Sequence, residues 1–169
     1  MSFRVGTASA NPGDISFGVI EVGKLADSST VDIPVILVNG SKLGSTLYLG
    51  AAVHGNEITG VEAIRRIIVK LDPKKVSGKI IAVPFQSSLA FRSMSRVTPN
   101  DFSPDNLDAL FPGTPDGSLT ERMAFLLMNE AISKADYVLD LHTGADKNMF
   151  VCCISPSPCL LYTSDAADE

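Results

Sequence analysis

Two histidines and a glutamate are the residues of this sequence that most clearly indicate chemistry. The chain contains two histidines, and each follows an apolar run where that run gives way to glycine and polar residues. His54 is followed three residues later by Glu57, and His142 lies far along the chain. Two imidazoles and one carboxylate are a common ligand set for zinc, and three protein ligands leave a position open for water or substrate. We therefore predict a catalytic metal centre at His54, Glu57 and His142.

These residues also have ordinary structural explanations, which the short H-x-x-E pattern alone does not exclude. A helix is expected to begin near Glu57, and the helix dipole stabilises a carboxylate in the first turn. His54 would suit a hydrogen-bonded position in the core. The matching position of His142, at the end of a second predicted strand, favours the metal centre over these alternatives.

Asp140 is a candidate partner for the second histidine. It precedes His142 by two residues, so both side chains point to the same face of a strand. A carboxylate in this position accepts the second N–H of the imidazole and fixes its tautomer, as around many zinc-bound histidines. The alternative is an aspartate that caps the turn after the strand.

Two arginines lie in a polar segment over residues 84–117, which is rich in Ser, Pro, Asn, Asp and Gly and has no sustained periodicity. A segment of this length inside a compact domain is usually functional or disordered. Arg92 and Arg96 are candidates for binding a substrate carboxylate or stabilising an oxyanion, because a guanidinium does both. The alternative for each is an ordinary surface arginine.

The surrounding elements are typical of a parallel α/β unit. Apolar runs predict strands, and apolar residues at three- and four-residue steps predict a helix. The strands are expected over residues 16–22, 31–38, 46–53, 79–83 and 137–141, and the helix over residues 58–71. Strand, helix and strand with short connections indicate parallel pairing. Ligands bind at the carboxyl ends of such strands, where both histidines are expected to lie.

The C-terminal third begins with a clear helix signal and ends without a pattern. Ser118 and Glu121 form a capping box, which predicts the start of a further helix. Residues 148–154 could begin another strand, but the pattern is lost from residue 155, and residues 159–169 resemble the translation of a transposon-end sequencing adapter. We therefore expect a non-native or disordered tail over residues 155–169.

Composition narrows the class of protein. The 169 residues suit one domain, and 45% apolar with 20% charged residues is typical of globular proteins. A net charge of −5 without a basic block disfavours a nucleic-acid partner. No secretory signal is visible and no apolar run is long enough to span a bilayer, so no membrane partner is expected. Three cysteines, two of them adjacent, do not form a disulfide framework, which favours the cytoplasm. The oligomeric state stays open.

Several short motifs follow one another along the chain as far as the second histidine. They are His54-Gly55-Asn56-Glu57 with Gly60, Val83-Pro84, Ala90-Phe91, Arg96 with Pro99 and Asp101, Phe111-Pro112-Gly113, Gly117-Ser118 with Thr120-Glu121-Arg122, Asp136-Tyr137, and Asp140-Leu141-His142. Together they resemble the succinylglutamate desuccinylase/aspartoacylase family, a branch of the zinc-carboxypeptidase-like fold. The resemblance extends to about residue 154.

This resemblance implies an α/β fold, with a zinc-carboxypeptidase-like mixed sheet flanked by helices. It implies Zn²⁺ held by His54, Glu57 and His142, with Arg96 polarising the scissile carbonyl. Members of the family hydrolyse the amide bond of a small N-acylated substrate, an N-acyl amino acid or N-acyl amine. A water on zinc attacks, and a separate glutamate acts as general base.

The chain departs from the family at two points. Where the family typically carries Asn-Leu-Asn-Arg to bind a substrate carboxylate, this sequence has Asn106-Leu107-Asp108-Ala109. Asp108 would repel an anionic substrate, so either the substrate lacks that carboxylate or Arg92 supplies the charge. The family's general-base glutamate lies C-terminal to the second histidine, in sequence that this chain does not contain. The resemblance therefore implies that residues 1–154 are the N-terminal part of a zinc-dependent catalytic domain, truncated before its general base, which we expect to bind metal better than it catalyses.

Two other functions stay open. A metallocarboxypeptidase would use the same metal ligands on peptides. A non-catalytic ligand-binding homologue would be consistent with the loss of the substrate-binding pair at Asp108 and Ala109.

Overall fold

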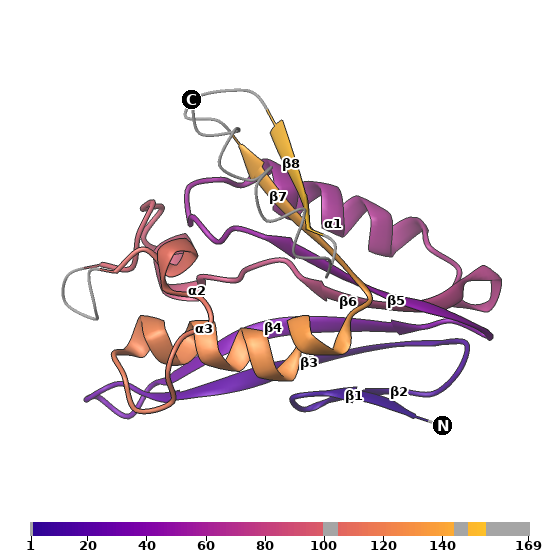
Figure 1. Ribbon diagram of the computed structural model, residues 1–169, viewed down its shortest axis with the longest axis horizontal. Coiled ribbons are helices and arrows are strands. Elements are labelled where there is room, and N and C mark those ends of the chain that lie inside the picture. The colour runs from indigo at the N-terminus through magenta and orange to yellow at the C-terminus, as the bar shows by residue number, and fades with distance from the viewer. Residues whose placement is uncertain (1, 100–104, 144–148, 155–169) are drawn as a thin grey trace.

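The computed structural model describes residues 2–99, 105–143 and 149–154. They form a mixed sheet with one long helix on one face and a second long helix and a two-stranded hairpin on the other (Figure 1). The six strands of this sheet follow the order β3-β4-β6-β5-β7-β8, and β1 pairs with β2 separately. The strands are β1 Phe3–Val5, β2 Ala8–Ala10, β3 Asp14–Lys24, β4 Thr30–Asn39, β5 Lys42–Ala51, β6 Ser77–Val83, β7 Tyr137–Thr143 and β8 Met149–Ile154. The helices are α1 Thr59–Lys70, α2 Ser88–Arg92 and α3 Leu119–Glu130, with 3₁₀ turns at Pro73–Lys75, Leu107–Leu110 and Ile132–Lys134.

Three neighbouring strands at the centre of the sheet run parallel. β5 pairs in parallel with β6 on one side and with β7 on the other, while the outer pairs β3–β4, β4–β6 and β7–β8 are antiparallel. The carboxyl ends of β5, β6 and β7 therefore meet at one edge of the sheet. The predicted mixed α/β sheet and the parallel unit β5-α1-β6 are confirmed.

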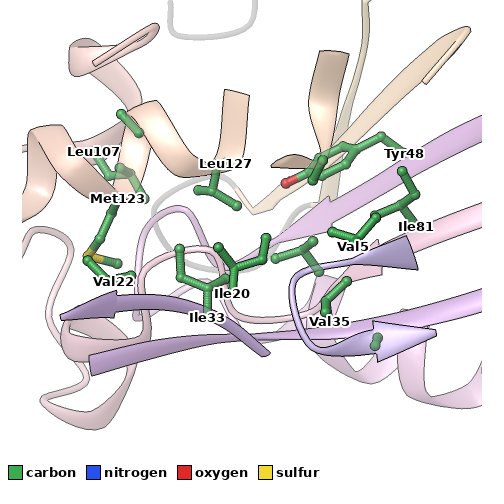
Figure 2. Packing of buried hydrophobic residues seen from close by; sticks show 14 of the residues in the cluster. Val5, Ile20, Val22, Ile33, Val35, Tyr48, Ile81, Leu107, Met123 and Leu127 are labelled. Atoms are coloured by element: carbon green, nitrogen blue, oxygen red, sulfur yellow. The ribbon is translucent and has the colours of Figure 1, made fainter. Parts of the chain in front are cut away.

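The alternating side chains of the strands divide the core into two clusters. Tyr48 of β5 packs in the cluster that includes α3 and the β1–β2 hairpin, whereas its neighbour Leu49 packs in the cluster that includes α1. Figure 2 shows the first cluster, with Met123 of α3 above Val22 of β3 and Leu127 of α3 above Ile20 of β3. The central strands are covered on both faces, which explains why their sequences are nearly continuously apolar.

Helix α1 lies unusually close to the sheet at its first turn. A Cβ on Gly60 would stand 2.7 Å from Leu141 Cβ and 3.0 Å from Ala51 Cβ, so only glycine allows this approach. Gly60 therefore holds the start of α1 against β5 and β7. Glu57, three residues earlier, is brought next to β7 by the same contact.

Some boundaries differ from the sequence-based expectation. The strand expected over residues 46–53 ends at Ala51, because Ala52 turns with a φ of +47°. The helix begins at Thr59 with Ile58 as N-cap, so Glu57 precedes the helix and does not lie in its first turn. The polar segment 84–117 contains α2 and a 3₁₀ turn, whose lengths of five and four residues are too short to give a periodic pattern.

Other expectations are confirmed. The Ser118 hydroxyl accepts the Glu121 N–H at 3.2 Å and the Glu121 carboxylate accepts the Ser118 N–H at 2.7 Å, which completes the capping box. The possible last strand forms as β8. The tail expected over residues 155–169 lies outside the described residues. Among the helices that the structure describes, none has the length and apolar character to cross a membrane.

Replacing Gly60 by valine is expected to lower the free energy of unfolding by about 1–3 kcal/mol, because the added carbons overpack the contact with Leu141 and Ala51. Chemical denaturation measures the change. Val69→Ala is the control, because Val69 is 73% exposed on the same helix and its loss should change stability by no more than about 0.5 kcal/mol. Equal stability of the Gly60 variant and the wild-type protein would contradict the close approach of α1 to the sheet.

Candidate metal centre

His54 is buried in a tight turn just after β5. Its carbonyl accepts the Glu57 N–H at 3.1 Å, and its Nδ1 lies 2.9 Å from Glu57 Oε1. The turn is pressed against α2, since a Cβ on Gly55 would stand 2.0 Å from the carbonyl carbon of Ala90. The backbone therefore directs both side chains of the H-x-x-E pattern toward the same point.

His142 reaches the same carboxylate from β7. Its Nδ1 lies 3.2 Å from Glu57 Oε2, and the two imidazole rings have centroids 5.3 Å apart at an interplanar angle of 64°. One nitrogen of each histidine and one oxygen of Glu57 all lie within 4.8 Å of one another. The structure thus brings together the three residues that the sequence singles out as metal ligands.

Glu57 is a buried anion with a partner for each oxygen. Oε1 accepts a hydrogen bond from Arg96 Nη1 at 3.0 Å, and Oε2 accepts one from the Thr143 N–H at 2.9 Å. Burial alone would raise the pKa of Glu57, but the hydrogen bonds from His142, His54 and the Thr143 amide hold that pKa well below its usual range. Glu57 is therefore ionised at neutral pH, as a metal ligand must be.

The second nitrogen of His142 faces Asp140. The distance from Nε2 to Asp140 Oδ2 is 3.2 Å, as the two-residue spacing predicts. Hydrogen bonding to Asp140, and then to Glu57, raises the pKa of His142 to about 10. Two carboxylates on opposite sides of one imidazole therefore stabilise a positive charge at this position.

The donor set fits a divalent cation. The Nδ1 atoms of His54 and His142 face the two oxygens of one ionised carboxylate, and nitrogen lone pairs repel an anion unless a proton or a cation lies between them. A divalent cation at this point would be held by all three groups and would supply the positive charge that the carboxylates favour there. The group His54, Glu57 and His142 could therefore hold a metal ion.

The remaining predicted residues lie at different distances from this centre. Arg96 contacts Glu57, whereas Arg92 is exposed at the end of α2 and makes no hydrogen bond or ion pair with the described residues. Asp108 Oδ2 lies 3.7 Å from Nε2 of His54, and this buried nitrogen has no hydrogen-bond partner in the described part of the chain. Asp108 thus brings a second negative charge to the outer side of His54.

Sequence reasoning missed two polar residues next to the centre. Gln86 is 2% exposed just after β6 and Tyr48 is 1% exposed within β5, and a chain of hydrogen bonds links them to Asp140. Gln86 follows a parallel strand at the edge where both histidines lie, and that position was the one signal available. Tyr48 lies within an apolar run and gives no such signal.

Comparisons of the sequence and the structure with known proteins match one family. The sequence model of the succinylglutamate desuccinylase/aspartoacylase catalytic domain matches residues 43–162. Among curated proteins, the N-alpha-acetyl-L-2,4-diaminobutyric acid deacetylase of Halomonas elongata is 37% identical over 114 residues, which are 68% of this chain and 32% of that protein. This chain therefore spans about a third of the length of that relative.

Several solved structures share this fold. A succinylglutamate desuccinylase from a Silicibacter species is 29% identical with a TM-score of 0.71, over 84% of this chain and 44% of that one. An aspartoacylase family protein from Mesorhizobium loti is 33% identical with a TM-score of 0.71, over 83% of this chain and 45% of that one. The product-bound ectoine utilization protein EutE (DoeB) of Ruegeria pomeroyi is 30% identical with a TM-score of 0.69, over 83% and 44%. The chain spans less than half the length of these structures.

We expect the purified chain to bind one divalent ion, and His142→Ala or Glu57→Ala to lower the affinity by more than about 100-fold, because even an outer partner of a ligand is worth about 10–100-fold. Metal analysis and titration with a competing chelator measure both results. Glu62→Gln is the matched control, because this glutamate lies on α1 and pairs with Arg65 and Arg66 in solvent. A chain that binds no ion, or a His142 variant with unchanged affinity, would contradict the site.

Proposed function

The chain belongs to the succinylglutamate desuccinylase/aspartoacylase family, and on that premise we propose that it carries the metal site of a zinc-dependent deacylase. The proposed reaction is hydrolysis of the amide bond of a small N-acyl amino acid or N-acyl amine. The observation that supports it most is the convergence of His54, Glu57 and His142 at the carboxyl ends of parallel strands. Two imidazoles and one carboxylate suit zinc and leave a position open, as in hydrolytic sites.

The residues around the centre suit this chemistry. Zinc, when bound, supplies Lewis acidity and an activated water at neutral pH. Glu57 and the two histidines would hold it, and Asp140 would keep His142 in the correct tautomer. Arg96 is 51% exposed and uses Nη1 on Glu57, so its remaining N–H groups are free of partners among the described residues and suit a carbonyl oxygen that gains negative charge.

The charges beside the centre bear on the substrate. Asp108 places a half-exposed carboxylate close to His54, and Ala109 provides no guanidinium for a substrate carboxylate. We infer a substrate whose group at this position is neutral or positively charged, unless Arg92 reaches it. The relative from Halomonas elongata is named for an acetylated diamino acid, a compound that carries a free amine. An acetylated amino acid with a second amine is therefore the first compound to test.

The complete gene product from the source locus is expected to release acetate from such compounds. A panel of N-acetyl amino acids with neutral, acidic and amine-bearing side chains identifies the preferred class. Release of C-terminal residues from peptides instead would support a metallocarboxypeptidase, and binding without any hydrolysis would support a non-catalytic homologue.

The double variant Asp108→Asn with Ala109→Arg tests the substrate inference in the same panel. It restores the pair that the family typically carries, so kcat/KM for carboxylate-bearing substrates should rise by about 10–100-fold, the value of a hydrogen bond to a charged group. An unchanged preference would show that these positions do not face the substrate.

The two arginines should differ in their effect. Arg96→Ala is expected to lower kcat by about 100-fold or more, because it removes a donor for the developing negative charge. Arg92→Ala should leave kcat unchanged, and it raises KM only if Arg92 supplies the charge for a substrate carboxylate. Equal and small effects of both substitutions would contradict the role proposed for Arg96.

A further inference from the structure

A line of buried hydrogen bonds runs from the core of the sheet to His142. The Tyr48 hydroxyl donates to Gln86 Oε1 at 2.8 Å, and Gln86 Nε2 donates to Asp140 Oδ1 at 2.7 Å. The other oxygen of that carboxylate, Oδ2, lies 3.2 Å from His142 Nε2. Three neighbouring strands contribute to this line, since Tyr48 lies on β5, Gln86 follows β6, and Asp140 and His142 lie on β7.

The chemistry of the groups sets the direction of every hydrogen bond. An ionised carboxylate only accepts, so the amide of Gln86 must turn its NH₂ toward Asp140. The amide oxygen then faces Tyr48, whose hydroxyl must donate. Burial, and then the charge of Asp140, raise the pKa of Tyr48 well above its usual value, so the hydroxyl keeps the proton that it donates.

The consequence at His142 is a choice of nitrogen. With Asp140 held as an acceptor, Nε2 carries a proton, and Nδ1 is the nitrogen that can give a lone pair to a metal. Nδ1 is also the atom on the side of Glu57, at 3.2 Å from Oε2. The line of hydrogen bonds therefore selects the tautomer that the metal centre requires.

The backbone around Gln86 holds its side chain in position for these hydrogen bonds. The Gln86 N–H donates to the Ala51 carbonyl at 3.0 Å and the Ser87 N–H to the Ala52 carbonyl at 3.0 Å, so the segment after β6 is fixed to the end of β5. A Cβ on Gly50 would lie 2.8 Å from Gln86 Nε2 and 2.9 Å from Asp140 Oδ1. The absence of a side chain at Gly50 leaves the space in which Gln86 and Asp140 meet.

We propose that Gln86, supported by Tyr48, is a positioning residue that holds Asp140 and through it the metal-binding orientation of His142. The inference rests on the proposed metal centre. It goes beyond that centre in one respect: metal affinity should depend on Gln86, although this residue acts only through Asp140 and would not contact the metal.

Three variants of the chain test this inference by metal affinity. Gln86→Leu removes both hydrogen bonds at similar volume, and Gln86→Glu keeps the shape but sets a carboxylate against Asp140. Both are expected to weaken zinc binding by about 10–100-fold, as loss of an outer partner does. Tyr48→Phe removes only the outermost hydrogen bond and should weaken binding by less than the Gln86 variants.

Thr120→Val is the control, because its hydroxyl donates to Thr98 at 3.0 Å in another buried pair, and among the described residues Thr120 has no side-chain hydrogen bond to His54, Glu57, Asp140 or His142. It should lower the melting temperature and leave zinc affinity unchanged. The imidazole ¹⁵N spectrum of His142 is a second readout, since the wild-type protein should show protonated Nε2 when metal is bound and the Gln86 variants a mixture of tautomers.

The outcomes separate this inference from the function on which it rests. A wild-type chain that binds no zinc would overturn the metal centre itself. A wild-type chain that binds zinc, with Gln86→Glu binding equally well and showing the same His142 spectrum, would overturn the role of Gln86 alone. If Gln86→Leu does not fold, Gln86→Glu and Tyr48→Phe decide in the same way.

Discussion

The carboxylate of Glu57 is the contact on which the site depends, because it joins three segments that are distant in the sequence. Oε1 contacts His54 and Arg96, and Oε2 contacts His142 and the Thr143 N–H. A buried charge is costly unless it is paired and hydrogen-bonded, so these partners are required wherever Glu57 is ionised. The same requirement makes the centre suited to a cation, which can replace several of these interactions at once.

Three glycines at five-residue intervals make that convergence sterically possible. Gly50 leaves room for the contact between Gln86 and Asp140. Gly55 allows the backbone of α2 to pack directly against the turn, and Gly60 allows α1 to pack against β7. In each place a Cβ would stand less than 3.0 Å from a neighbouring atom. The turn that carries His54 and Glu57 therefore lies between three close contacts, and the fold positions these two side chains through backbone packing as well as through hydrogen bonds.

Much of this arrangement could be predicted from the sequence, because some signals are local. The spacing of Asp140 and His142 on one strand face and the apolar runs that end at both histidines are read without knowing the fold. The role of Gln86 and the contact of Asp108 with His54 could not be predicted, because each depends on how distant segments are brought together. Gln86 meets Asp140 only through the order β6-β5-β7, and Asp108 reaches His54 only through a four-residue 3₁₀ turn in a segment without periodicity.

The most direct test of the account is anomalous diffraction at the zinc absorption edge from crystals of the zinc-loaded protein. The proposed metal centre requires a single strong peak at about 2.0–2.1 Å from Nδ1 of both histidines and at about 2.0–2.2 Å from a carboxylate oxygen of Glu57. A zinc peak at bonding distance from Nε2 of either ring instead of Nδ1, or away from these three residues, would contradict the proposed metal centre.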